Sequence, residues 1–212
     1  MIAVFDFDHT IINGNAGKEY VKYQLNNSIV RKIITILCSP VVWLLSLFPL
    51  TRPLGRSIPV YISTVGLSES DIQESAVRFS SMLTLFEDAV AAIEHHQNTG
   101  SKILVITASP EVIVNLVLQK NVQNFNDIVV IASTAKRWFG GYVIQQFCKG
   151  ENKVKMAMEQ DIADNWGAGY SDDHADIPFL SRCRKKYLIN PNPQTIRIID
   201  TVFSDYQVLE WT

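Results

Sequence analysis

Apolar residues along the chain gather in short runs separated by amphipathic stretches, a pattern that indicates strands alternating with helices. The first run begins at Ile2, is β-branched at Ile2 and Val4, and fits a buried parallel strand. Such alternation predicts an α/β fold in which a parallel sheet is flanked by helices. Further strands are predicted at residues 102–107, at 127–133, at the start of 166–173 and within 185–193.

Amphipathic stretches predict the helices between these strands. Gly100 is placed to end one helix, and Pro110 is placed to begin the next. The adjacent glycines Gly140 and Gly141 indicate a β-hairpin over residues 137–147. The helices are predicted at residues 16–32, 69–84, 86–100, 111–120, 151–163 and 174–183.

The region between the first strand and the second lacks any strand pattern. Residues 13–85 instead contain helical patterns and one long apolar segment, residues 33–50. We therefore predict a catalytic core made of residues 1–12 and 86–212, with residues 13–85 inserted as a helical cap. A chain of 212 residues is long enough for such a core with an insert.

Composition excludes several classes of protein. The chain is 47% hydrophobic and 19% charged, and its net charge of −2 offers no general positive field for nucleic acid. Its three cysteines, Cys38, Cys148 and Cys183, are widely spaced and argue against a disulfide framework or a zinc site. A reducing compartment is therefore expected. The first residues lack a basic segment followed by a long apolar one, so no signal peptide is expected.

Polar side chains follow the predicted strands at the points where these strands end. In open α/β sheets, ligands bind beyond the carboxyl ends of the strands, so these side chains are expected to meet. Several carboxylates in one cleft need a cation, and a set of carboxylate oxygens suits Mg²⁺. A lysine and a hydroxyl beside them would bind phosphate oxygens. The residues are Asp6 and Asp8, then Thr107, Ala108 and Ser109, then Lys153, and finally Asp172, Asp173 and Asp176.

Four short motifs formed by these residues resemble those of the haloacid dehalogenase superfamily of phosphatases, in its phosphoserine-phosphatase-like subgroup (subfamily IB). They are "DFDHT" at residues 6–10 as D-x-D-x-T, "ITAS" at 106–109, "CKGENK" at 148–153 as C-x-G-x-x-K, and "SDDHAD" at 171–176 as the last motif. The resemblance implies a Rossmann-like core and a Mg²⁺-dependent phosphatase with a phospho-aspartate intermediate. The motifs cover both ends of the chain and leave the insert unmatched.

The resemblance also implies a role for each matching residue. Asp6 would be the nucleophile and Asp8 the general acid and base, while Lys153 would neutralise the nucleophile and the phosphate. The substrate phosphate would be bound by Thr107, Ala108 and Lys153. Asp6, Asp172 and Asp8, the last through its backbone carbonyl, would bind the metal. The implied supporting residues are Thr10, Ser109, Asp173 and Asp176.

Two positions depart from the motifs. His9 stands where glycine is usual, and Ser171 stands where glycine often precedes the metal-binding aspartate. We expect neither side chain to take part in the chemistry, and we expect both to affect only the local backbone.

The apolar segment, residues 33–50, has 18 residues without charge and is close in length to a membrane span. A single crossing would place Asp6 on the opposite side of the bilayer from Thr107 and the later motifs. A hairpin that enters and leaves on one side avoids this problem, and Ser39–Pro40 is a plausible turn for it. Basic residues flank both ends, which fits contact with anionic headgroups. The alternative is a pair of helices packed within the cap. The flanking residues are Arg31, Lys32, Arg52 and Arg56.

The position of this segment is similar to that in bacterial phosphatidylglycerophosphatase C. This resemblance implies dephosphorylation of phosphatidylglycerophosphate to phosphatidylglycerol at the cytoplasmic side of the bacterial inner membrane, with the flanking arginines near lipid phosphates. One alternative is a phosphatase of soluble metabolites in the cytoplasm, acting on phosphoserine or histidinol phosphate. Another is a membrane-associated binding protein without turnover.

Overall fold

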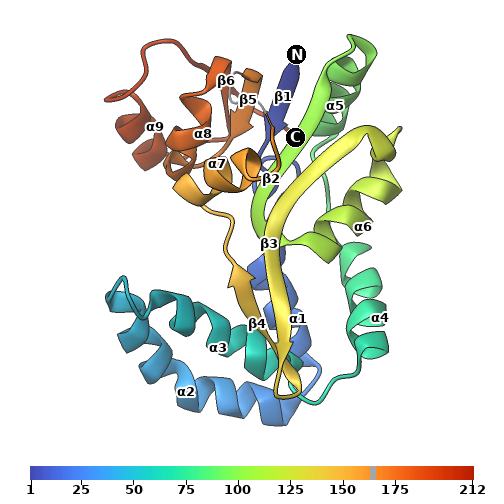
Figure 1. The fold of residues 1–212 in the computed structure, drawn as a ribbon, viewed down its shortest axis with the longest axis vertical. Helices are drawn as coiled ribbons and strands as arrows, with labels where there is room; N and C mark the ends of the chain where they lie inside the picture. Colours follow the sequence, from blue (N-terminus) through green and yellow to red (C-terminus); the bar gives the residue numbers. More distant parts are fainter. Residues whose placement is uncertain (163–165) are drawn as a thin grey trace.

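The structure is a computed structural model that describes residues 1–162 and 166–212, and its α/β architecture confirms the predicted fold class. A seven-stranded sheet runs in the order β4-β3-β2-β1-β5-β6-β7, and its pairs are parallel except for the antiparallel pair β3–β4 (Figure 1). The strands are β1 Ile2–Phe5, β2 Lys102–Pro110, β3 Ile128–Trp138, β4 Gly141–Gln146, β5 Trp166–Ser171, β6 Cys183–Ile189 and β7 Gln207–Leu209.

Helices follow most strands and also fill the long segment between β1 and β2. Residues 13–85, all of which are described, contain no strand, as the sequence predicted. The helices are α1 Ala16–Asn26, α2 Ile29–Leu47, α3 Arg52–Thr64, α4 Glu69–Ser80, α5 Glu87–Asn98, α6 Glu111–Asn121, α7 Glu151–Met158, α8 Ile177–Leu180 and α9 Pro193–Ile199, with short 3₁₀ turns at Phe125–Asp127 and His174–Asp176.

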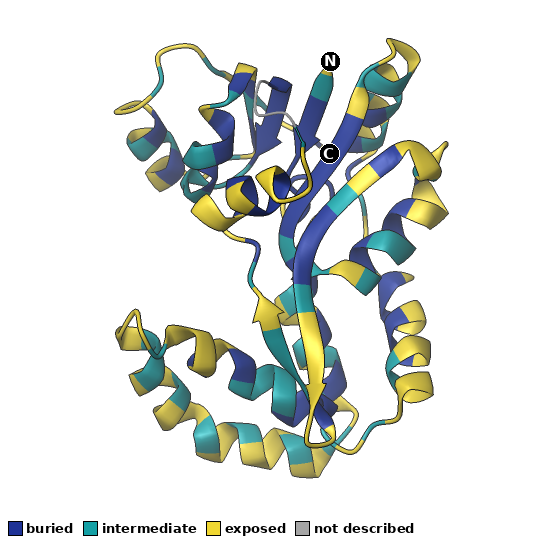
Figure 2. Ribbon diagram, in the orientation of Figure 1, coloured by how far each residue is buried: buried dark blue, intermediate teal, exposed yellow. Residues whose placement is uncertain are grey.

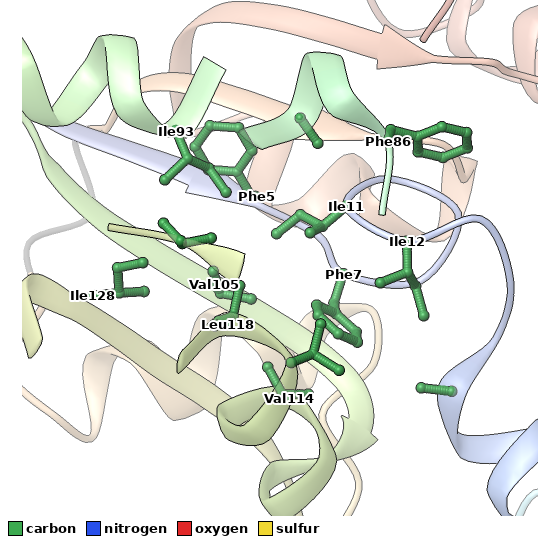
Figure 3. Packing of buried hydrophobic residues seen from close by; sticks show 14 of the residues in the cluster. Phe5, Phe7, Ile11, Ile12, Phe86, Ile93, Val105, Val114, Leu118 and Ile128 are labelled. Carbon is green, nitrogen blue, oxygen red and sulfur yellow. The ribbon is translucent and has the colours of Figure 1, made fainter. Parts of the chain in front are cut away.

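β1 lies at the centre of the sheet and is buried on both faces. Phe5 belongs to the hydrophobic cluster shared with α5 and α6 (Figure 3). Its neighbour Val4 belongs to the cluster under α7 and α8. Phe5 and Phe7 are completely buried, and each burial stabilises the fold by about 1.5–3 kcal/mol. Packing on both faces therefore fixes the carboxyl end of β1, where Asp6 and Asp8 follow.

Helices α1 to α3 and the β3–β4 hairpin form the end of the molecule opposite the two termini (Figure 1). The free edge of β4 is covered by α3, because Thr64 Oγ1 accepts from Tyr142 N at 2.9 Å and Ser57 Oγ accepts from Ile144 N at 3.3 Å. The hairpin predicted around Gly140 and Gly141 thus forms, and it ties the sheet to the helices of the insert.

The predicted turn at Ser39–Pro40 is wrong, because α2 runs without interruption from Ile29 to Leu47. Pro40 cannot donate to the carbonyl of Ile36, but the Ser39 hydroxyl does so at 2.7 Å, so this carbonyl keeps a donor. The chain turns instead at residues 48–51, between α2 and α3. The helix predicted for residues 16–32 is also broken, since Ser28 caps α2 by accepting from Arg31 N at 3.4 Å.

Other boundaries differ less. The sequence pattern missed α9 and β7 and ended β2 at Thr107 instead of Pro110. The helix predicted for residues 151–163 corresponds to α7, which ends at Met158, and its last predicted residue lies outside the described residues.

Candidate active site

The carboxyl ends of the central strands bring the predicted residues together. Asp6 directly follows β1, and its N–H donates to the carbonyl of Tyr170 on β5 at 2.9 Å. This bond extends the pairing of the two strands, so Asp6 and the segment after β5 remain adjacent. Asp6 is 6% exposed and Lys153, near the start of α7, is 2% exposed.

Lys153 lies between two carboxylates. Its Nζ donates to Asp6 Oδ1 at 2.6 Å and to Asp176 Oδ2 at 2.8 Å. Ser171 Oγ donates to the same Asp176 oxygen at 2.6 Å. Lys153 is thus held in position by two carboxylates. Asp6 follows β1, and Asp176 lies in the turn after β5.

Burial and like charges dominate the electrostatics of this cluster. Burial alone would lower the pKa of Lys153, but the charges of Asp176 and Asp6 raise it above its ordinary range. Burial raises the pKa of Asp6 well above its usual value against the opposing charge of Lys153, and Asp176, Asp8 and Asp172 raise it further. Burial and then the charge of Asp176 raise the pKa of Asp172 to about 7. One lysine therefore does not neutralise the carboxylates gathered here.

Asp8 is held by the start of α1. Its Oδ1 accepts from Ala16 N at 2.8 Å, and the Ser109 hydroxyl lies 2.8 Å from both carboxylate oxygens. Asn15 Nδ2 donates more weakly to Oδ2, at 3.3 Å. Burial raises the pKa of Asp8, although the hydrogen bonds from Ser109 and Ala16 act in the opposite direction. A carboxyl group with a raised pKa and a fixed orientation is suited to donating and accepting a proton.

A β-bulge shapes the end of β2. β2 pairs with β3 up to Thr107 and pairs again only at Pro110, so Ala108 and Ser109 lie outside the ladder. Ser109 N donates to Thr107 Oγ1 at 3.0 Å, which leaves the Thr107 hydroxyl proton for another acceptor. The bulge thus supplies a hydroxyl donor and displaced backbone groups beside Asp8.

The remaining predicted residues differ in their environments. Thr10 Oγ1 is buried and has no hydrogen-bond partner among the described residues, so the hydroxyl predicted to support the site is not bonded. Asp173 caps the turn after β5 by accepting from Ala175 N at 3.1 Å, and its carboxylate lies 3.5 Å from Lys149 Nζ. Its pKa is lowered: burial opposes this shift, but the Ala175 and Lys149 contacts prevail.

The two departures from the motifs have different outcomes. His9 has a φ of 55°, in the left-handed region that favours glycine, so the backbone explains why glycine is usual there. Ser171 makes a contact that the sequence did not predict, because its hydroxyl donates to Asp176 Oδ2 at 2.6 Å and so helps to position Asp176. Sequence reasoning also missed Asn15 and Ala16, although an asparagine before a helical pattern is a known capping signal.

Asp6, Asp8 and Asp172 are the candidate ligands of a divalent cation. Within residues 1–162 and 166–212, no group of three or more His, Cys, Asp or Glu side chains is arranged as a metal site. The Asp8 carboxylate is already bound by Ala16 and Ser109, so this residue offers only its backbone carbonyl. Two carboxylates, Asp6 and Asp172, remain, with more negative charge than Lys153 balances. Such an oxygen set fits Mg²⁺, which keeps several water ligands.

Solved structures share this fold. A protein of unknown function from Bordetella pertussis Tohama I is 18% identical with a TM-score of 0.73, and the match covers 98% of this chain and 97% of that one. A phospho-aspartyl intermediate analogue of phosphoserine phosphatase is 17% identical with a TM-score of 0.62, covering 98% and 92%. Cytosolic 5'-nucleotidase IIIB bound to cytidine is 15% identical with a TM-score of 0.64, covering 100% and 81%.

Two sequence comparisons complete these findings. The glycerol-3-phosphate acyltransferase RAM2 of Petunia hybrida is 26% identical over an alignment of 192 residues that covers 88% of this chain. The chain spans only 39% of the length of that relative. A family model described as haloacid dehalogenase-like hydrolase matches residues 3–181, from β1 to just beyond α8. The chain therefore belongs to the haloacid dehalogenase-like hydrolase family.

Proposed function

We propose that the chain is a Mg²⁺-dependent phosphomonoester hydrolase that acts through a phosphorylated Asp6. The observation that carries this proposal is the buried pair of Asp6 and Lys153, joined at 2.6 Å beside Asp8 and Thr107. A carboxylate held by a lysine can attack phosphorus, while the lysine balances the charge of both groups. The family and the shared fold of phosphatases support the same reaction class.

The two aspartates have different roles in the proposed reaction: Asp6 is the nucleophile, and Asp8 is the general acid and base. Asp6 attacks phosphorus as the bond to the leaving oxygen breaks, and Asp8 gives its proton to that oxygen. Asp8 then takes a proton from water, which attacks phosphorus and releases phosphate from Asp6. The hydroxyl of Thr107 and the ammonium of Lys153 bind the phosphoryl oxygens, and Asp176 keeps Lys153 in place.

The metal would be held by the carboxylates of Asp6 and Asp172 and by the carbonyl of Asp8. When bound, Mg²⁺ neutralises negative charge between the phosphate and the nucleophile. The raised pKa values of Asp6 and Asp172 support this assignment, because buried carboxylates of like charge gain most from a cation.

Replacing Asp6 tests the mechanism. We expect Asp6→Asn to reduce release of phosphate from p-nitrophenyl phosphate by at least about a thousandfold with Mg²⁺ present, because an amide cannot act as the nucleophile. Acid-quenched wild type should carry one phosphoryl group on the peptide that contains Asp6. The matched control, Asp127→Asn in an exposed 3₁₀ turn, should behave as wild type. Equal turnover by wild type and Asp6→Asn would refute the mechanism.

We further propose that the substrate is a phosphorylated lipid, with phosphatidylglycerophosphate as the preferred candidate and residues 13–85 as the cap. The support comes from α2, which exposes many large apolar side chains. Its outward side chains are apolar, including Leu37 at 73% and Trp43 at 65% exposed. The half-exposed residues of this helix are of mixed polarity: Arg31, Thr35, Cys38, Val42, Leu45 and Ser46.

The length of α2 agrees with contact between the insert and a membrane. None of its 19 residues, all described, is buried, and Figure 2 shows it without buried segments. Within the described part of the chain, α2 is the one helix long and apolar enough to cross a membrane, with a mean hydropathy of 1.7. A helix whose outer face is this apolar is expected to bury that face against lipid.

The space for the rest of the substrate would lie between the insert and the core. A cavity of about 300 Å³ is found between α3, β4 and α7. Its charged lining residues are Arg56 from α3, Lys155 from α7 and Glu159, whose carboxylate lies 3.9 Å from Lys155 Nζ. The Arg56 guanidinium lies 4.4 Å from the centre of the Phe147 ring, so this arginine reaches the core segment after β4. A lipid that carries a phosphodiester as well as a phosphomonoester matches this arrangement.

A substrate panel separates this proposal from its alternative. We expect phosphatidylglycerophosphate in mixed micelles to be hydrolysed with a much higher kcat/KM than phosphoserine, histidinol phosphate or p-nitrophenyl phosphate. A strong preference for one of the soluble esters would refute the lipid proposal and leave the phosphatase mechanism intact.

A further inference from the structure

The tip of the β3–β4 hairpin exposes two aromatic side chains. Trp138 is 52% exposed and Phe139 is 80% exposed. Phe139 has a φ of 42°, a backbone conformation that bulky L-residues rarely adopt and that glycine adopts freely. Phe139 therefore occupies a position where its side chain strains the backbone and gains almost no burial within the chain. A contact outside the chain would account for an aromatic residue here.

The tip is held firmly by the insert. Tyr61 on α3 donates its hydroxyl to the carbonyl of Phe139 at 2.9 Å, and Gly66 N donates to the carbonyl of Gly140 at 2.9 Å. The Tyr61 ring also meets the Trp138 ring edge to face, with centroids 5.9 Å apart. The two aromatic side chains are thus presented by a fixed scaffold, and α3 carries both this scaffold and the contact with α2.

The hairpin tip and α2 lie at the same end of the long axis of the molecule (Figure 1). In Figure 2 the hairpin tip is exposed, and α2 consists of exposed and intermediate residues. α2 contains no acidic residue and carries Arg31 and Lys32 in its first turn, and Lys136 is exposed next to the tip. Aromatic and aliphatic side chains beside basic ones are typical of surfaces that enter the headgroup region of anionic bilayers.

We propose that Trp138 and Phe139 form a second membrane anchor, which binds the interface of an anionic bilayer together with the outer face of α2. This proposal rests on the membrane contact of the proposed function and adds a contact site outside the insert. Two anchors on different elements fix the orientation of the molecule, with the two chain termini on the side away from the bilayer (Figure 1). An interface between two copies of the chain is the competing occupant, and the experiments below distinguish it.

Phe139→Gly is the first test, because glycine suits the left-handed backbone and the variant should fold at least as well as wild type. In sedimentation with vesicles of phosphatidylglycerol and phosphatidylcholine, we expect it to bind about tenfold more weakly than wild type. Asn124→Gly is the matched control, since Asn124 is also exposed and has a φ of 50° far from the tip. This control should bind as wild type does.

Tryptophan fluorescence gives a second, independent readout. Trp166 and Trp211 are buried, so in Trp43→Phe the exposed Trp138 is the tryptophan that lipid can reach. We expect vesicles with brominated acyl chains to quench Trp43→Phe, and we expect this quenching to disappear in Trp43→Phe combined with Trp138→Phe. Both variants should hydrolyse p-nitrophenyl phosphate like wild type, so the readout does not depend on the lipid substrate.

Three results would overturn the proposal. Phe139→Gly could bind vesicles as tightly as wild type, or Trp43→Phe could show no quenching while wild type does. Alternatively, the lipid-free protein could be a stable dimer by light scattering that fails to bind vesicles, which would assign this surface to a second copy. None of these outcomes would affect the phosphatase mechanism, which Asp6→Asn tests separately.

Discussion

Lys153 is the cation that pairs with the buried carboxylates of Asp6 and Asp176. Lys153→Met leaves Asp6 and Asp176 buried without their cation, and we expect the free energy of unfolding to fall by about 3–5 kcal/mol. Lys155→Met on the same helix is the control, because that side chain is 73% exposed and should change stability by only about 0.5 kcal/mol. Urea denaturation measures both. A loss of similar size in the two variants would contradict the assignment of Lys153 as the central cation.

Asp172, a ligand of the proposed metal site, links that site to pH. Its pKa in the folded, metal-free protein is about 7, against an ordinary value of 3.8, so the folded state binds its proton more tightly than the unfolded state does. Stability from this group is therefore complete below about pH 4 and is lost as the pH rises towards 7. We expect Asp172→Asn, with a chelator present, to raise Tm relative to wild type at pH 8 and to change it little at pH 4.

Magnesium is the control for this experiment. Added Mg²⁺ should raise the Tm of wild type at pH 8 and raise that of Asp172→Asn much less, because the variant lacks one ligand. An equal Mg²⁺ effect in both proteins, or a Tm difference that does not depend on pH, would remove Asp172 from the proposed metal site.

At the residue scale, the motif spacing predicted which side chains would meet, because strand ends in a parallel sheet converge. It could not predict the bond from Ser171 to Asp176, since this depends on how the turn after β5 folds back. It also could not predict that Thr10 lacks a partner. Both are properties of three-dimensional packing that a local sequence pattern does not encode.

At the element scale, α3 carries the one basic residue of the insert that lies against the segment after β4. Of the flanking arginines, Arg31 donates to Val65 O and Arg52 to Ser46 O, whereas Arg56 lies over the Phe147 ring. We expect Arg56→Gln to raise KM for phosphatidylglycerophosphate about tenfold, consistent with the loss of one charged contact. KM for p-nitrophenyl phosphate should stay unchanged. Equal effects on both substrates would argue against a diester contact.

Two elements show what a local sequence pattern does not predict. The proline at position 40 predicted a break, yet the neighbouring Ser39 hydroxyl supplies the donor that Ile36 loses, and α2 continues. The short strand β7 carries almost no periodic signal because it has only three residues. It exists because Gln207 and its neighbours pair with the edge of β6, a contact between distant segments.

At the scale of the whole molecule, apolar surface is divided between a packed core and the outer face of α2. Leu37→Asp and Leu44→Asp change side chains that are 73% and 52% exposed, so we expect changes in unfolding free energy within about 0.5 kcal/mol. Vesicle binding should fall at least tenfold, because a carboxylate is repelled by anionic lipid and costly to bury. Loss of stability comparable to that of a core variant such as Ile93→Asp would show that α2 is packed and not free.

The central position of β1 has a consequence for how the protein is made. Val4 pairs with Leu104 on one side and with Gly169 on the other. During synthesis β1, which Asp6 follows, can pair on both sides only after β2 and β5 have been made. The sheet therefore forms through contacts between distant segments, which form slowly. The apolar α2 leaves the ribosome long before Gly169 does. Under the proposed membrane contact, the nascent chain is therefore already attached to lipid when its nucleophile first meets Lys153.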